Sequence, residues 1–95
     1  MKTGTTSTGF AFTFDERNAD DMRMIELIAL GDDPNATEFQ KLAASSKILE
    51  MLLGKEQKSA LYEHIGGFHD GRVPVADLMT PLKEIMSAGG DSLKN

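Results

Sequence analysis

The sequence predicts a mainly α-helical fold, in which one small domain of about four helices carries a short N-terminal β-strand. Ninety-five residues supply apolar side chains for one hydrophobic core rather than two. Apolar residues recur at helical spacing along most of the chain, and one short segment alternates with the period of a strand instead. We therefore expect a single helical domain over residues 9–88, a flexible leader over residues 1–8 and a polar tail over residues 89–95.

Composition and charge exclude several classes of protein. Hydrophobic residues make up 40% of the chain and charged residues 26%, which is ordinary for a chain that folds. The net charge of −5 has the wrong sign for a protein that neutralises phosphates, so we expect no nucleic acid partner. Absence of cysteine, of a signal sequence and of any bilayer-length apolar run predicts a cytoplasmic protein with no membrane contact.

The N-terminal residues divide into a polar stretch and an aromatic stretch. Residues 1–8 have almost nothing to bury, so we expect them to be a flexible leader. In Gly9–Phe14, three phenylalanines occupy alternate positions and would share one face of a strand. We expect this strand to lie across the helical core. The pattern leaves open whether it pairs within the chain or with a second copy.

A first helix is expected over Asn18–Leu30. Asp20 and Asp21 in its first turn suit the positive end of the helix dipole, and Gly31 is a typical C-terminal residue. Because its apolar residues fall on two sides, we expect cover on both. One side holds Met22, Ile25 and Ala29, and the other holds Met24, Leu27 and Ile28.

Two more helices follow the turn Gly31–Asn35. The second is expected over Thr37–Leu53 and is closed by Gly54, and the third over Glu56–Ile65 is closed by the pair Gly66-Gly67. Ile48, Met51 and Leu52 widen the apolar surface around the last turns of the second helix, so this end is either buried deeply or sticky. The helix also has an apolar stripe: Phe39, Leu42, Ala43, Ser46, Leu49 and Leu53. Small Ser46 would there permit close helix packing.

The loop Phe68–Arg72 precedes a fourth helix, whose first turn suits Pro74. Pro81 should kink or divide this helix, with Thr80 then capping the second piece. Its stripe is the cleanest amphipathic pattern in the chain: Val75, Leu78, Met79, Leu82, Ile85 and Met86.

No motif for catalysis stands out. His64 and His69 lack the spacing of a helical metal pair, and the addition of Asp70 makes only a nominal ligand set. Ser45 and Ser46 have no His or Lys at a spacing that indicates a base. The paired glycines lack the pattern of a phosphate loop. We therefore predict a protein that is not an enzyme and has no cofactor and no metal.

Charge is concentrated in one quarter of the chain. Eight acidic residues and two basic ones lie between Asp15 and Glu38, giving this segment a net charge of −6. Such a segment is usually a solvated face, yet it can steer a basic partner or imitate a phosphate backbone. One hypothesis is therefore a small acidic regulatory protein that binds a basic surface of a host protein.

The methionines point to another kind of binding. Five of the six lie at apolar positions of the expected helices, where flexible thioethers fill a core or adapt to varied partner segments. Together with the nearly all-round apolar first helix, they favour a non-enzymatic binding module. The candidate partner-binding residues are Met22, Ile25, Leu27, Met51, Leu52 and Met79.

Four segments carry a family resemblance: Leu52–Gln57, Ala60–His64, Asp70–Val75 and Leu82–Ile85. With the Phe-rich start, they resemble the small tail assembly chaperones of long-tailed phages and prophages of Gram-positive bacteria. The resemblance covers about residues 10–88, and none of its motifs is catalytic.

The resemblance implies a function in the bacterial host cytoplasm. It implies a chaperone that binds the long, largely helical tape measure protein and keeps it soluble while the tail tube assembles. The tail tube protein is a further candidate partner, and a homo-oligomer is left open. Salt distinguishes the two hypotheses, because an acidic contact weakens with ionic strength and an apolar groove does not.

Overall fold

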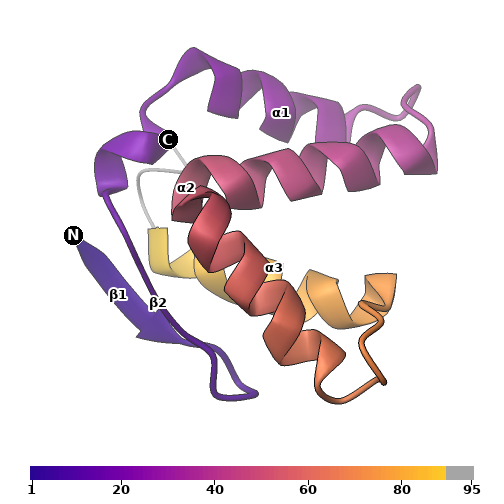
Figure 1. Cartoon of the computed structure of the whole chain (residues 1–95). Coiled ribbons are helices and arrows are strands. Elements are labelled where there is room, and N and C mark those ends of the chain that lie inside the picture. Colours follow the sequence, from indigo (N-terminus) through magenta and orange to yellow (C-terminus); the bar gives the residue numbers. More distant parts are fainter. Residues whose placement is uncertain (90–95) are drawn as a thin grey trace.

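The computed structural model describes residues 1–89, in which a two-stranded antiparallel sheet precedes a set of packed helices (Figure 1). The mainly helical prediction is confirmed. The elements are β1 (Lys2–Thr5), β2 (Ala11–Phe14), the 3₁₀ helix η1 (Glu16–Ala19), α1 (Met22–Asp32), α2 (Glu38–Gly66) and α3 (Val75–Gly89). Gly89 ends α3, and the rest of the expected polar tail, residues 90–95, lies outside the described residues.

The N-terminal residues form a hairpin, which corrects the expectation of a flexible leader over residues 1–8. β1 pairs with β2 within the same chain, with Lys2 opposite Phe14 and Thr5 opposite Ala11. Two hydrogen bonds between Thr6 and Phe10 close the turn. The Thr6 amide donates to the Phe10 carbonyl at 2.8 Å, and the Phe10 amide donates to the Thr6 hydroxyl at 3.1 Å. Although β1 buries little, its ladder bonds and β-branched threonines offset the ordering entropy.

The face of β2 that carries the phenylalanines is buried, as the alternation predicts. Phe10, Phe12 and Phe14 are 8%, 6% and 2% exposed. Gly4 makes room for this packing, because a Cβ there would lie 2.7 Å from Phe12 Cζ. On the other edge of β2, the side-chain amide of Gln57 both donates to and accepts from the backbone of Thr13, at 2.6 and 2.9 Å. The strand is therefore part of the core structure.

Helix α1 begins later than the sequence predicts. The Asp21 carboxylate accepts a 2.8 Å hydrogen bond from the Arg23 amide and caps the helix, while residues 16–19 form η1 instead. The helix continues through Gly31 to Asp32. Only one of its two apolar sides is covered: Met24 is fully buried, whereas Met22 and Ile25 are 68% and 45% exposed.

The predicted interruption at Gly54 is confirmed, but the second and third helices of the prediction follow each other directly and form the single bent element α2, so residues 1–89 hold three α-helices where about four were expected. A capping box between Thr37 and Gln40 starts the helix. Gly54 has φ +82° and ψ 165°, and helical geometry resumes directly after it. We call residues 38–53 the first limb and residues 55–66 the second limb.

Helix α3 runs through Pro81 without division, so of the two alternatives expected there, a kink or a division, the division is wrong. Pro81 cannot donate to the Asp77 carbonyl, but its ring is buried, and that burial offsets the lost bond. Thr80 is an exposed interior residue of the helix and caps nothing. Leu78, Leu82 and Ile85 enter the core as predicted.

The core lies where the phenylalanine face meets α1, both limbs of α2 and α3. Its fully buried side chains come from all three helices and are Met24, Leu49, Leu52, Leu61 and Ile85. In Figure 1, α1 lies along the first limb of α2, while α3 and the second limb lie on the other side of that limb. This arrangement leaves two apolar surfaces open, one on each side of the first limb.

Candidate functional site

The structure divides the six candidate partner-binding residues among three environments. Met22 and Ile25 lie on the exposed side of α1, and Leu27 and Met51 are half-buried against the core. Leu52 is fully buried in the core, so the prediction that it contacts a partner is wrong. Met79 is half-buried and lines an apolar hollow between α2 and α3. The six residues therefore do not form one surface.

The hollow beside Met79 is lined mostly by apolar side chains of two helices, and we call it the α2–α3 groove. It has a volume of about 200 Å³ and receives side chains from both limbs of α2, the loop after α2 and α3. Its lining residues are Leu42, Ser46, Tyr62, Val73, Val75, Leu78 and Met79. Five of these side chains are aliphatic or thioether groups, which suits an apolar partner side chain.

The bend at Gly54 creates the groove by turning the second limb back beside the first. Its backbone conformation lies in a region that is essentially restricted to glycine. Two contacts then join the limbs. Tyr62 Oη lies 3.3 Å from Ser46 Oγ, and Lys58 Nζ lies 3.8 Å from Glu50 Oε1. The groove is thus a consequence of one glycine and a few polar contacts across the bend.

Ser46 makes a contact that the sequence does not predict. Its hydroxyl lies within hydrogen-bond distance of the only tyrosine of the chain. Lys58 Nζ also lies 5.6 Å from the centroid of the Tyr62 ring, which is within range of a cation–π contact. Tyr62 is therefore held from two directions, with one part of its surface facing the groove.

The first part of the apolar stripe on α2 lies at the surface, whereas its last turns are buried. Phe39 is 85% exposed, Ala43 is exposed, and Leu42 lines the groove. Only Leu49 and Leu53, at the far end of the stripe, are buried. Since Phe39 lies one helical turn before Leu42, an apolar strip leads from the start of α2 into the groove.

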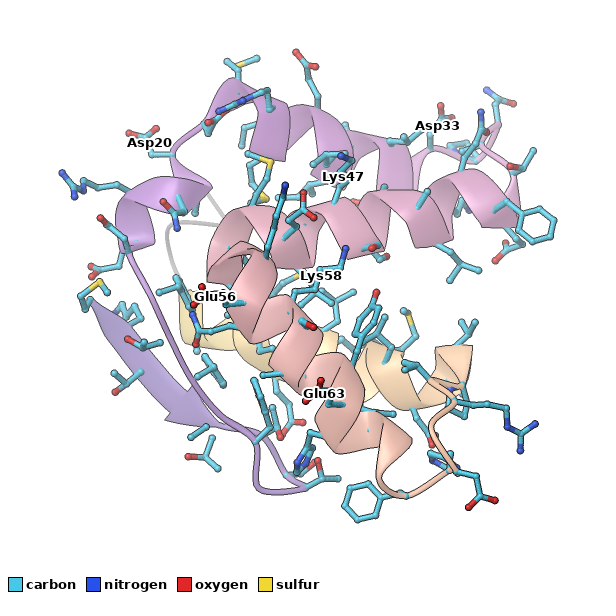
Figure 2. All side chains as sticks on the ribbon, in the orientation of Figure 1. Asp20, Asp33, Lys47, Glu56, Lys58 and Glu63 are labelled. Atoms are coloured by element: carbon cyan, nitrogen blue, oxygen red, sulfur yellow. The ribbon has the colours of Figure 1, made fainter. Side chains whose placement is uncertain are left out.

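A second hollow continues from the same side chains. Tyr62 and Val73 line both hollows, and the second has a volume of about 500 Å³. Backbone of Gly66, Gly67 and Gly71 forms much of its wall, with Ser59 and Glu63 at the side. Figure 2 shows Glu63 on the second limb of α2. The two hollows together form a longer, shallow surface that is open to solvent.

Sequence reasoning missed most residues of the groove, although it noted the signals that lead to them. The stripe through Leu42 is visible in the sequence but does not distinguish core from groove, and Gly54 predicts the helix end without the direction in which the next helical segment leaves. Val75 belongs to the predicted stripe of α3, yet it is 53% exposed at the groove. Tyr62 carried no periodic signal that set it apart.

The two histidines are bound to different partners. His64 Nε2 lies 3.1 Å from Thr8 Oγ1, whereas His69 Nε2 contacts the carboxylate of Asp77. A Ser-His-Asp type relay needs one imidazole between a hydroxyl and a carboxylate, and here each histidine has one of the two. Their contacts fix the hairpin tip and the loop after α2 around a mixed hollow of about 290 Å³.

No group of three or more His, Asp or Glu side chains within residues 1–89 is arranged to hold a metal ion. Asp70, which the nominal ligand set included, is exposed in the loop and has φ +55°. Across the same residues, no helix has both the length and the apolar content to cross a bilayer.

Two carboxylates of the acidic segment are paired with arginines two residues later. The Asp15 side chain accepts hydrogen bonds from the Arg17 guanidinium and amide, which lower its pKa to about 2. The same arrangement with Arg23 lowers the pKa of Asp21. These pairs neutralise part of the segment at the start of η1 and of α1.

Comparison with known proteins gives no assignment: no family model, no curated protein and no solved structure matches this chain.

Proposed function

We propose that the chain is a non-enzymatic tail assembly chaperone whose α2–α3 groove takes an amphipathic helix of the tape measure protein. The observation that supports the binding role most is the open apolar strip from Phe39 through Leu42 to Met79 and Val75. The segments Leu52–Gln57 and Asp70–Val75, which resemble such chaperones, support the choice of partner.

The groove suits a client of this kind. A helix buries its apolar stripe most readily between two other helices, and α2 and α3 present the two walls. The thioether of Met79 adapts to differing side chains, so one groove serves many similar sites along a long client. Covering those stripes keeps the tape measure protein soluble in the host cytoplasm until tail tube subunits, a further candidate partner, enclose it.

The experiment is co-expression with the tape measure protein, followed by size exclusion with light scattering at low and high salt. We expect a soluble complex that persists at high salt, because burial of apolar surface is not screened. An insoluble client beside an unbound domain would overturn the proposal.

A pair of adjacent substitutions tests the groove itself. Val75→Glu places a charge at the groove, and Ala76→Glu places the same charge on the next residue, which is exposed outside it. We expect the first variant to lose the client and the second to retain it. Both should melt near the wild-type temperature, since both sites are exposed. Equal binding by the two variants would exclude the groove.

Salt also distinguishes this proposal from the acidic regulator. If the complex instead dissociates as salt rises while Val75→Glu still binds, contact through the acidic segment between Asp15 and Glu38 explains the binding better.

A further inference from the structure

A second apolar surface lies on α1, on the side of the first limb of α2 opposite to the groove. Met22, Ile25 and Ala29 are all exposed there, and Met22 and Ile25 keep 68% and 45% of their surface in solvent. Their spacing of three and four residues places them in one stripe along the helix. Single exposed apolar residues are ordinary, but a helical stripe is the pattern with which one helix recognises another.

Carboxylates surround this stripe. Glu26 lies beside it, Asp20 precedes the helix, and Asp32 and Asp33 end it; Figure 2 shows Asp20 and Asp33 at the two ends of α1. Within residues 1–89, no ion pair joins any of these four carboxylates to a basic group. The one basic residue on the helix, Arg23, is bonded to Asp21. These four carboxylates are therefore available to basic groups of a partner.

We propose that the exposed face of α1 is a docking surface for a basic amphipathic helix of a partner protein. Charge complementarity selects this occupant. A second copy docked through the same face would bring the two sets of carboxylates together, and anionic lipid headgroups would be repelled. A helix with an apolar stripe and flanking Lys or Arg side chains covers Met22 and Ile25 and neutralises Glu26 and Asp32 at once.

The surface is separate from the groove, so the two proposals stand or fall independently. The first limb of α2 lies between α1 and α3, and the groove receives no side chain from α1. A protein with both surfaces can hold an apolar helix on one side and a basic helix on the other.

A labelled synthetic amphipathic peptide of leucine and lysine is the probe, and fluorescence anisotropy measures its binding. In the double variant Met22→Ser/Ile25→Ser, we expect affinity to fall about tenfold, since two apolar contacts are lost while the charge is unchanged. Phe68→Ser is the matched control, because Phe68 is 64% exposed and lies on the loop after α2. That control should bind like the wild type.

A second matched pair tests the charge. Glu26→Gln/Asp32→Asn should weaken peptide binding and reduce its salt dependence, whereas Glu56→Gln/Asp70→Asn removes the same charge from exposed sites on α2 and the loop after it and should change little. All four sites are exposed, so circular dichroism should show unchanged melting for both variants.

Three outcomes would overturn the proposal. If each α1 variant and its control lost peptide affinity equally, the peptide would be attracted by the overall negative charge of the protein rather than by α1. If the variant Val75→Glu no longer bound the peptide, the binding site of the peptide would be the groove and not α1. Light scattering that shows a wild-type dimer, dissociated by Met22→Ser/Ile25→Ser, would make a second copy the occupant.

Discussion

The two halves of the first limb of α2 have similar apolar patterns but opposite environments. In the early half, Phe39 and Leu42 lie at the surface and the groove, and in the late half, Leu49 and Leu52 are fully buried. Both halves are continuous α-helix before Gly54. The difference shows that helical periodicity identifies the apolar face of a helix but not what covers that face. The arrangement of the neighbouring elements decides whether the core or a partner does so.

The sharpest test of this comparison removes one apolar side chain from each half. Leu49→Ala should lower the free energy of unfolding by about 2–5 kcal/mol, because it leaves a cavity in the core. Phe39→Ala removes a larger side chain but should cost less than about 0.5 kcal/mol, since Phe39 is 85% exposed. Urea denaturation measures both values. Similar costs would mean that Phe39 is covered in the folded protein.

This contrast explains which parts of the fold could be predicted. The phenylalanine segment and the α3 stripe were predictable because a period of two or of 3.6 residues marks one apolar face, and for Phe10–Phe14 and for Leu78, Leu82 and Ile85 that face is buried. The hairpin was not, because β1 has no apolar pattern and depends on pairing with β2. The one feature of the sequence that favours a strand at β1 is its β-branched threonines beside a turn.

The candidate site was harder to predict than the fold. Leu52 and Met79 have the same apolar character, yet one is fully buried and the other lines the groove. That distinction depends on the direction of the chain after Gly54. The sequence marks a break there, but it does not state the angle at which the second limb leaves. The groove therefore required tertiary structure.

The bend itself can be tested with two glycines that have open space around them. Gly54→Ala should lower the free energy of unfolding by about 1–3 kcal/mol, because φ +82° with ψ 165° strains any residue with a Cβ. Gly31→Ala, inside helical α1, should instead raise it by about 0.4–1 kcal/mol. Thermal melts followed by circular dichroism distinguish the two signs. A stabilising Gly54→Ala would show that the bend is not held at this residue.

The smallest expected effect lies at the boundary between the two halves, where Ser46 meets Tyr62 across the bend. Tyr62→Phe should lower the free energy of unfolding by about 0.5–1 kcal/mol, because it removes the hydroxyl of the 3.3 Å contact and keeps the ring. Ser46→Ala should cost a similar amount, and the double variant should cost less than the two together, since both remove the same bond. Fully additive costs would mean that the hydroxyls do not interact. In that case, Gly54 and apolar packing alone would set the angle between the limbs, and the groove would have to owe its shape to its aliphatic walls.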